Sequence, residues 1–329
     1  MLNGKKVLIT GGTGSFGKKC TEIILQKFKP KKVIIFSRDE LKQFEMAQQF
    51  SQDDSPINYL LGDVRDKDRL HRAFNGIDYV IHAAALKQVP ACERDPFEAI
   101  KTNVMGAENI INAAIDNNVD RVIALSTDKA ASPINLYGAT KLCSDKLFVA
   151  GNSYSGLQKT RFSVVRYGNV VGSRGSVIPF FLKLKKKGVL PITDPRMTRF
   201  FITLDQGVNF VLSCLKLSSG GELFVPKLPS MKITDLARVV APKCKHEIVG
   251  IRPGEKIHEV LLSDSDSRRA IEYSKFFIVE PEYKWWSTNG KLTEKGVRVP
   301  DGFTYSSDNN SSWLSEDKLL KMIEKLNLT

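Results

Sequence analysis

The side chains best suited to chemistry in this 329-residue chain stand at the end of one apolar run. The run closes with Ser-Thr-Asp-Lys at 126–129, and Tyr137 and Lys141 follow as a Tyr-x-x-x-Lys pair. Residues four apart share one face of a helix, so the spacing predicts an ammonium group beside a phenol. A neighbouring cation lowers the pKa of a tyrosine, which would let Tyr137 accept the proton of an alcohol during its oxidation. A solvated helix face is the alternative, and the position of the pair favours catalysis.

A glycine-rich turn near the start of the chain predicts a dinucleotide site. The segment Thr10–Gly17 reads Thr-Gly-Gly-Thr-Gly-Ser-Phe-Gly, after an apolar strand at Lys6–Ile9 and before an apolar pattern of helical period. Glycines between a strand and a helix let backbone amides approach a pyrophosphate at the positive end of the helix dipole. An ordinary tight turn is the alternative, but both flanking elements stand where cofactor binding requires them.

The end of the second expected strand indicates which dinucleotide would bind. Proteins specific for NAD usually place an acidic residue there, where it binds the ribose 2′-hydroxyl. Here the strand ends in Ser37 and Arg38, and Asp39 follows. Ser37 leaves room for a 2′-phosphate, and Arg38 can pair with that phosphate or stack on adenine. These residues favour NADP, although Asp39 could still face the ribose.

Strand and helix patterns alternate through the first half of the chain. We expect strands at Lys32–Ser37, Asn58–Leu61, Asp78–Ala83, Arg121–Ser126 and Arg161–Arg166. We expect helices at Asp39–Phe50, Asp66–Phe74, Pro96–Asn118 and Asn135–Asn152. Repeated βαβ units with strands apolar on both faces predict an α/β fold, a Rossmann-like doubly wound parallel sheet.

The later part of the chain is less regular and predicts a smaller mixed α/β substrate lobe. We assign residues 1–168 with 200–226 to an NADP-binding domain, because Phe200–Leu217 and Leu223–Val225 are expected to return to the sheet. Residues 169–199 with 227–329 are expected to form the substrate lobe. The tail Ser315–Leu326 has acidic residues in its first turn and an apolar face, which predicts an amphipathic helix.

Composition favours a soluble cytoplasmic enzyme. The chain has no apolar run near the roughly 20 residues of a membrane helix. Its five cysteines are scattered, as is typical of free thiols in a reducing compartment, and its four histidines show no metal-ligand spacing. The net charge is +13, but the densest basic run, at 183–187, lacks interleaved aromatic residues. We therefore expect no metal, no nucleic-acid partner and no membrane contact, and we assign the charge to steering of anionic small ligands.

Several motifs together resemble a known family. The glycine loop, Gly-Asp-Val-Arg-Asp at 62–66, His-Ala-Ala-Ala at 82–85 and Tyr-Gly-Ala-Thr-Lys at 137–141 are similar to those of extended short-chain dehydrogenases/reductases that act on nucleotide sugars. Arg166–Ser176 and Arg252–Glu259 are similar to segments of the configuration-inverting UDP-N-acetylglucosamine 4,6-dehydratases. The resemblance extends over nearly the whole chain. It implies a UDP-sugar substrate, tightly bound NADP that is recycled in each turnover, and a homo-oligomer, either a dimer or a hexamer.

The resemblance also implies roles for individual residues. Tyr137 and Lys141 would act on the 4-hydroxyl with Thr127, while Asp128 and Lys129 would transfer protons at C5 and C6. Retaining dehydratases carry Thr-Asp-Glu here, with the glutamate as C5 base; a desolvated Lys129 with a lowered pKa could serve instead. We expect Lys129 at C5 and Asp128 at the departing 6-hydroxyl, but the sequence leaves open which is base and which is acid.

The resemblance further implies two sets of ligand contacts. The expected cofactor contacts are Gly11, Thr13, Gly14, Ser15, Phe16, Gly17, Ser37, Arg38, Asp39, Asp63, Val64, Ala83, Ala84, Lys87, Tyr137 and Lys141. The expected substrate contacts are Lys87, Asn169, Val170, Ser173, Arg174, Thr193, Arg252 and Glu255. The arginines would hold the diphosphate by charge-assisted hydrogen bonds.

The expected activity is that of a lyase that dehydrates UDP-N-acetylglucosamine with inversion at C5. The product would be UDP-2-acetamido-2,6-dideoxy-β-L-arabino-hex-4-ulose, which begins pseudaminic acid (flagellin glycan) biosynthesis. The alternatives are a nucleotide-sugar 4-epimerase, a retaining 4,6-dehydratase for capsule or O-antigen sugars, and a dinucleotide-sensing regulatory or scaffold protein. An epimerase needs no C5 base, and a sensor is expected to lose the Tyr/Lys pair.

Overall fold

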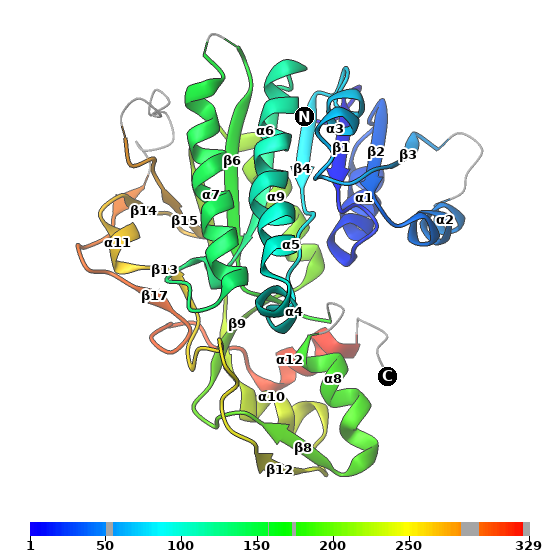
Figure 1. Cartoon of the computed structure of the whole chain (residues 1–329). Coiled ribbons are helices and arrows are strands. Elements are labelled where there is room, and N and C mark those ends of the chain that lie inside the picture. Colours follow the sequence, from blue (N-terminus) through cyan, green and yellow to red (C-terminus); the bar gives the residue numbers. More distant parts are fainter. Residues whose placement is uncertain (51–54, 157, 173–175, 284–295, 325–329) are drawn as a thin grey trace.

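The computed structural model describes residues 1–50, 55–156, 158–172, 176–283 and 296–324 (Figure 1). Within these ranges the chain forms a large sheet flanked by helices and a smaller part below it. The expectation of a Rossmann-like α/β fold is therefore confirmed.

The large sheet explains where a ligand can bind. Its order is β16-β14-β15-β10-β6-β5-β4-β1-β2-β3, and the strands from β3 to β10 are parallel. These strands are β1 (Lys6–Thr10), β2 (Lys32–Ser37), β3 (Ile57–Leu61), β4 (Tyr79–His82), β5 (Arg121–Thr127), β6 (Arg161–Tyr167) and β10 (Leu223–Pro226). The order reverses between β1 and β4, and doubly wound sheets bind ligands at the carboxyl ends of the strands beside that point.

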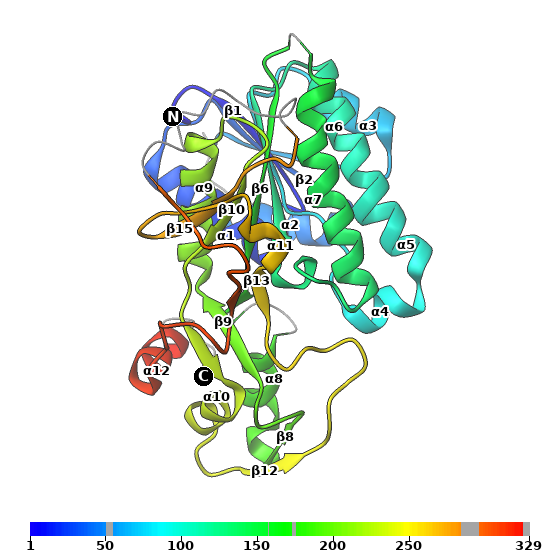
Figure 2. The same cartoon turned by 90° about the vertical axis from the view of Figure 1, so that its left-hand side faces the viewer.

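Helices cover both faces of this sheet, as its strands require. Val7, Leu8 and Ile9 of β1 are fully buried, so neither face of the strand can meet water. Figure 2 shows α1 and α9 on one side of the sheet and α3, α6 and α7 on the other. The bounds are α1 (Ser15–Lys27), α2 (Glu40–Gln49), α3 (Lys67–Ala73), α4 (Val89–Arg94), α5 (Pro96–Ile100), α6 (Gly106–Asp116), α7 (Leu136–Tyr154) and α9 (Leu204–Leu217).

The helix expected at Pro96–Asn118 is not continuous. A π-helical turn at Lys101–Met105 separates α5 from α6. Such turns recur at functional sites because the extra residue changes which side chains face inward. Here the turn buries Thr102 and Asn103 beside the sheet. The apolar period of the sequence does not distinguish a π turn from an α-helix, so this feature could not be expected.

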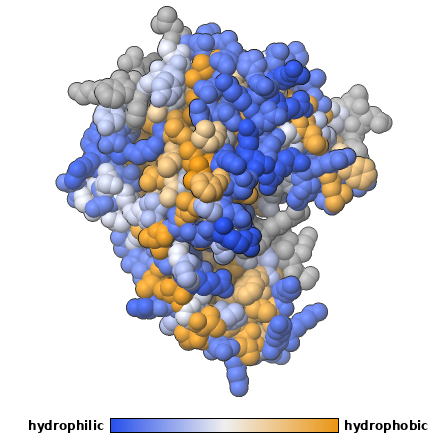
Figure 3. Space-filling model, viewed as in Figure 1, coloured by the Kyte–Doolittle hydropathy of each residue, from blue (hydrophilic) through white to orange (hydrophobic). Residues whose placement is uncertain are grey.

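The smaller part has its own core. Its strands are β7 (Asn169–Val170), β8 (Val189–Ile192), β9 (Thr198–Ile202), β11 (Ser230–Lys232) and β12 (Lys245–Ile248), and its helices are α8 (Val177–Leu184), α10 (Ile233–Val240) and α12 (Glu316–Glu324). The strands β13 (Val260–Leu262) and β17 (Tyr305–Ser306) pair with each other and bury Leu261, Leu262 and Tyr305 in the core of the large sheet, and α11 (Asp264–Ser267) follows β13 beside β14 and β15 (Figure 1). The expected tail helix is thus present as α12, whose Leu319 and Ile323 are buried with α8 and α10. Figure 3 shows hydrophobic residues exposed on this lower part, where α8 lies.

One edge of the large sheet is formed by strands that the expected domain division places in the substrate lobe. The strands β14 (Ala270–Glu272), β15 (Phe276–Val279) and β16 (Val297–Arg298) extend the large sheet beyond β10 in antiparallel pairing. We had placed these residues in the substrate lobe, because their short apolar runs follow no βαβ pattern. The amphipathic α9 packs against α1, and β10 joins the large sheet, whereas Phe200–Ile202 belong to β9, which pairs with β7 and β11 in a separate sheet.

Candidate active site

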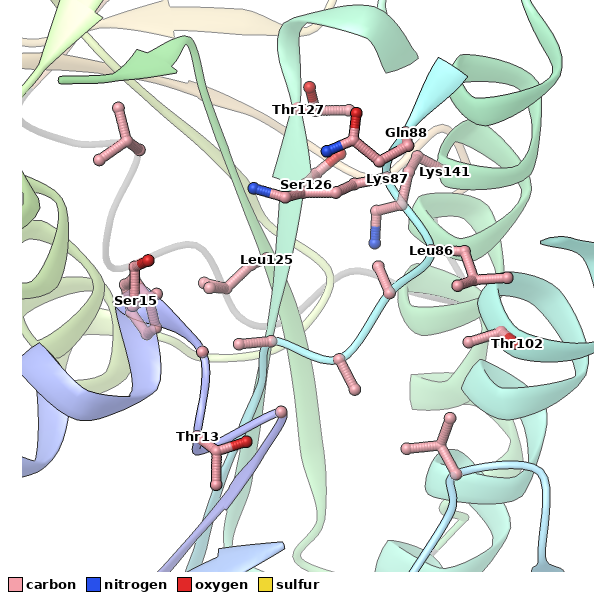
Figure 4. Close-up of a pocket in the computed structure, with 18 of the residues that line it drawn as sticks. Thr13, Ser15, Leu86, Lys87, Gln88, Thr102, Leu125, Ser126, Thr127 and Lys141 are labelled. Carbon is pink, nitrogen blue, oxygen red and sulfur yellow. The ribbon is translucent and has the colours of Figure 1, made fainter. Parts of the chain in front are cut away.

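A cavity of about 680 Å³ lies at the carboxyl ends of the parallel strands. Figure 4 shows its lining side chains converging from the glycine loop, the end of β5, the segment after β4 and α7. Of the expected residues, its wall contains Gly11, Thr13, Gly14, Ser15, Phe16, Ser37, Arg38, Asp39, Asp63, Val64, Ala83, Ala84, Lys87, Thr127, Asp128, Lys129, Tyr137, Lys141, Asn169 and Val170. One cavity therefore joins the dinucleotide loop to the Tyr/Lys pair.

The glycine loop leaves space that a side chain would fill. Gly11 has φ +64°, and a Cβ there would lie 2.8 Å from the Ala84 nitrogen. Gly14 is the N-cap of α1 and has no side chain that could cap the helix, so the first amides of α1 are available to an anion. Gly17 does not line the cavity; a Cβ there would lie 2.3 Å from the Gly12 oxygen, so Gly17 lets α1 pack against the loop. The loop thus fits a dinucleotide pyrophosphate.

The ribose end of the cavity is built from hydroxyl groups and cations. The Thr13 and Ser37 hydroxyl oxygens lie 2.9 Å apart. Asp39 caps α2 by accepting a hydrogen bond from the Lys42 amide at 3.0 Å, and it pairs with the Lys42 side chain. These contacts with Lys42 lower the pKa of Asp39. Arg38 lies in the cavity wall with its side chain exposed, and its guanidinium is 3.6 Å from Asp63.

The segment after β4 forms the wall opposite the glycine loop. Asn103, from the π turn, accepts from the Leu86 amide at 2.9 Å and donates to the Leu86 carbonyl at 2.8 Å. It also donates to the Thr140 hydroxyl on α7. These bonds fix the chain that carries Lys87 and Gln88, which project toward the cavity in Figure 4.

Tyr137 faces the end of β5, but its acidity differs from the expectation. Desolvation raises the pKa of Tyr137 to about 12, against the lowering effects of Lys129 and of a hydrogen bond with Thr127. The expectation that Lys141 lowers this pKa toward neutrality is wrong, because desolvation dominates and the strongest opposing cation is Lys129. Lys141 is buried, and that burial lowers its own pKa.

Lys129 lies between two carboxylates. Its Nζ is 3.1 Å from Asp128 Oδ1 and 3.2 Å from Glu259 Oε1. Desolvation acts to lower the pKa of Lys129, but the two carboxylates outweigh it and the pKa is raised. The expected lowering is therefore wrong, since sequence spacing could not reveal Glu259 as a second partner. Lys129 is held as an ammonium group.

Asp128 is more deeply buried than Lys129, its partner in the ion pair. It is 2% exposed, and its Oδ1 accepts from the Thr127 hydroxyl at 2.9 Å as well as from Lys129. Its other oxygen, Oδ2, has no hydrogen-bond partner among the described residues. A buried carboxylate oxygen without a partner is costly, so a polar ligand is the expected occupant of this position.

The expected substrate residues fall into three groups. Lys87, Asn169 and Val170 line the cavity, and Asn169 Oδ1 is buried without a hydrogen-bond partner in the described ranges. Ser173 and Arg174 lie outside the described residues. The structure does not bring the others into the cavity wall: Thr193 donates to Met197, and Arg252 is exposed beside Glu255 at 3.8 Å. The segment that carries Arg252 and Glu255 contacts the start of α7, since the Gly254 carbonyl accepts a hydrogen bond from the Asn135 side chain at 2.8 Å.

Several charged and polar residues of the site are not among the expected contacts. Glu259 and Arg199 belong to the charged cluster, and Lys42 and Thr102 line the cavity. Glu259 ended a quoted motif, so its segment was signalled but its contact was not. Within the ranges that the structure describes, no three His, Cys, Asp or Glu side chains are grouped to hold a metal ion, and no helix is long and apolar enough to cross a membrane.

The strand order, the glycine loop and the Tyr/Lys pair at the end of β5 define an extended short-chain dehydrogenase/reductase fold. Residues 7–281 match the family described as "Polysaccharide biosynthesis protein", and the chain belongs to this family.

Relatives with known names share almost the full length of the chain. The chain is 57% identical to UDP-N-acetylglucosamine 4,6-dehydratase (inverting) of Campylobacter jejuni subsp. jejuni, over 98% of each chain. It is 39% identical to UDP-glucose 4-epimerase of Rickettsia canadensis, over 99% of this chain and 97% of that relative. The structure of Pen from Bacillus thuringiensis is 39% identical and superposes with a TM-score of 0.91 over the whole of both chains. These likenesses confirm the resemblance that the motifs indicated.

Proposed function

We propose that this protein dehydrates UDP-N-acetylglucosamine at C4–C6 with inversion at C5, using NADP. The observation that carries the proposal is the Asp128–Lys129 pair, joined at 3.1 Å, in the same cavity wall as Tyr137. A 4-epimerase needs an acid–base group only at the 4-hydroxyl, whereas dehydration also needs groups at C5 and the 6-hydroxyl. The 57% identity to the inverting dehydratase of Campylobacter jejuni supports the same assignment.

The first chemical step requires proton removal from the 4-hydroxyl. When bound, the nicotinamide supplies a hydride acceptor for C4 and a hydride donor for C6. Tyr137 takes the proton of the 4-hydroxyl. Thr127, which is hydrogen-bonded to Tyr137, orients that hydroxyl. Lys141, buried on the same helix, would hold the cofactor ribose. Because the pKa of Tyr137 is about 12, a positive charge brought by the cofactor is expected to assist its ionisation.

Asp128 and Lys129 carry the later proton transfers. The 4-ketone acidifies the C5–H bond, and Asp128 is the better placed base because Lys129 is held protonated by two carboxylates. The departing 6-hydroxyl takes up the proton collected by Asp128 and leaves as water. Lys129 then donates a proton to C5 from the other face, which gives the inverted L-arabino product. This order differs from the sequence-based expectation in the C5 base, which is now Asp128 instead of Lys129; Asp128 still acts at the 6-hydroxyl and Lys129 still acts at C5.

We assign the expected ligand contacts by their positions. Gly11, Thr13, Gly14, Ser15, Phe16, Asp63, Val64, Ala83 and Ala84 hold the dinucleotide from the cavity wall. Asn169, Val170 and Lys87 meet the sugar nucleotide there. Ser173, Arg174, Thr193, Arg252 and Glu255 are proposed to meet the UDP group on the basis of family resemblance.

NADP rather than NAD is supported by the ribose end of the cavity. Ser37 presents a hydroxyl instead of a carboxylate, Arg38 is exposed beside it, and Asp39 is engaged with Lys42. Since a hydrogen bond to a charged group contributes about 1.5–3 kcal/mol, Arg38→Ala should reduce the preference for NADP over NAD by roughly tenfold or more. Calorimetric titration with both cofactors measures this preference. An unchanged ratio of the two dissociation constants would contradict the assignment.

The wider assignments follow from the product. A 4-keto-6-deoxy sugar of L-arabino configuration is the intermediate that opens pseudaminic acid (flagellin glycan) biosynthesis, and we propose that place for the enzyme. We further propose a cytoplasmic homo-oligomer, a dimer or hexamer, that keeps its cofactor bound through turnover. Because the hydride returns to the sugar, turnover should need no added reductant.

Mass spectrometry of the product tests the proposed reaction. With UDP-N-acetylglucosamine and NADP, the dehydratase gives a product lighter by one water, while a 4-epimerase gives a product of unchanged mass. The epimerase is the second candidate because of the 39% identity to UDP-glucose 4-epimerase of Rickettsia canadensis. A product of unchanged mass, with no loss of water at any time, would overturn the dehydratase proposal.

A further inference from the structure

Glu259 reaches the charged cluster around Lys129 from a segment far along the chain from Asp128 and Lys129. It immediately precedes β13, and its side chain is 3% exposed. Its backbone amide donates to the Ser307 hydroxyl at 3.0 Å, and its carbonyl accepts from the Ser307 amide at 2.8 Å. These two bonds fix the backbone at Glu259, so its carboxylate is presented to the end of β5 by a rigid support.

Among the residues that the structure describes, the ion pairs of the Glu259 carboxylate are with Lys129 and Arg199. Its Oε1 lies 3.2 Å from Lys129 Nζ and 3.8 Å from Arg199 Nε. Arg199 in turn donates to the carbonyls of Thr198, Lys256 and Ile257, which hold the guanidinium in place. Glu259 therefore links the segment before β13 to the proton-transfer pair.

The cluster is unusual for a purely structural ion pair. Glu259 Oε2 and Asp128 Oδ2 are both buried, and neither has a hydrogen-bond partner among the residues described. Buried ion pairs generally contribute little net stability, because desolvation offsets the attraction between the charges. Clusters of buried, mutually perturbed charges in a cavity wall are instead frequent where proton transfer occurs.

We propose that Glu259 is a positioning residue for proton transfer: it holds the Lys129 ammonium group beside Asp128, ready to protonate C5. The proposal rests on the proposed function. In this step the Lys129 N–H bond breaks, and the electron pair of the substrate enolate forms the new C5–H bond. Lys129 is left as a neutral amine and regains a proton from solvent, while Glu259 keeps its negative charge throughout.

The charges around Lys129 determine how the proposal can be tested. The charged and titratable groups that face Lys129 are Asp128, Glu259, Arg199, Tyr137 and Lys256. Glu259 is the carboxylate in this set that does not belong to the Thr-Asp-Lys segment. Removing its charge should therefore leave Asp128 in place and let Lys129 lose its proton at a lower pH.

The direct test is the titration of Lys129 in Glu259→Gln. Proteins labelled with ¹³C at lysine Cε are titrated by NMR, and the Lys129 signal is assigned from its absence in Lys129→Met. We expect the Lys129 titration to move to lower pH in Glu259→Gln, and less far in Glu259→Asp, which retains the charge on a shorter side chain. This measurement needs no turnover, so it decides the inference even if the proposed reaction is wrong.

A matched control separates electrostatics from loss of structure. Glu222 is also buried, accepting from the Ser163 hydroxyl at 2.6 Å and from the Ser219 and Gly220 amides at 2.9 Å, but it lies at the amino end of β10, away from the cavity. Glu222→Gln should leave the Lys129 titration unchanged. An unchanged titration in Glu259→Gln would overturn the proposal. If Glu259→Gln does not fold, an unchanged titration in Glu259→Asp would do the same.

Turnover supplies a second readout. A general acid typically contributes about 10²–10⁴-fold, so losing its positioning partner should lower kcat by roughly 10- to 100-fold with little change in KM. Partial recovery is expected in Glu259→Asp. Two results together would make Glu259 a structural residue. The first is that kcat is as low in Glu259→Asp as in Glu259→Gln. The second is that Glu222→Gln, at an equal loss of thermal stability, shows the same fall in kcat.

Discussion

The two ends of the cavity are built on opposite principles. The cofactor end consists of glycines, backbone amides, hydroxyls and partly exposed charges, contributed by short segments at 11–17 and 37–39. The proton-transfer end contains buried charges brought together from 128–129, 199 and 259. The first end can be read from local sequence, while the second exists only once the chain has folded. Binding and catalysis in this cavity should therefore respond differently to substitution.

The largest effect should come from Tyr137→Phe. This change removes the proton acceptor at the 4-hydroxyl, and acid–base groups typically contribute about 10²–10⁴-fold to turnover. We expect a loss of kcat in that range, while substrate affinity measured by calorimetry is preserved. The control is Tyr79→Phe, a buried tyrosine at the amino end of β4. Loss of affinity as severe as loss of turnover would make Tyr137 a structural residue.

The next effect concerns the cofactor end alone. Gly11→Ala introduces a methyl group 2.8 Å from the Ala84 nitrogen at φ +64°, so the loop must shift. We expect cofactor affinity to fall by roughly tenfold or more, since a misplaced loop loses charge-assisted bonds of about 1.5–3 kcal/mol.

Gly4→Ala is the matched control for that variant. Gly4 has a similar φ of +69° but open space around its Cβ position. It should therefore show only the cost of a left-handed residue, about 1–2 kcal/mol in unfolding free energy, with unchanged cofactor affinity. Equal cofactor affinity in both variants would show that the close approach of Gly11 and Ala84 does not shape the site.

The smallest expected effect is a change in the pKa of Tyr137, and it distinguishes the role of Lys129 from that of Lys141. Since Lys129 is the main cation that lowers the pKa of Tyr137, Lys129→Met should raise this pKa further, and the phenolate would form at higher pH. Lys141→Met should change it less. Ultraviolet absorbance of phenolate, corrected with the Tyr137→Phe variant, measures the titration directly. A larger shift in Lys141→Met would restore the pairing that the sequence indicated.

The extent of successful prediction follows the same division. The glycine loop, most strands of the parallel sheet and the positions of Asp128, Lys129, Tyr137 and Lys141 follow from patterns within about twenty residues of sequence. The raised pKa of Lys129 could not be foreseen, because Glu259 stands 130 positions later in the chain. The raised pKa of Tyr137 results from desolvation, which depends on packing rather than spacing. The antiparallel edge β14–β16 was missed because its short strands give no periodic signal.

The stereochemistry at C5 tests the central claim most directly. The reaction is run in deuterated water with UDP-N-acetylglucosamine, and the earliest product is examined by NMR. Because Asp128 and Lys129 are proposed to act on opposite faces of C5, the account predicts an L-arabino 4-keto-6-deoxy sugar that carries deuterium at C5. An earliest product of solely D-xylo configuration, with the L-arabino form appearing only later without enzyme, would contradict the account.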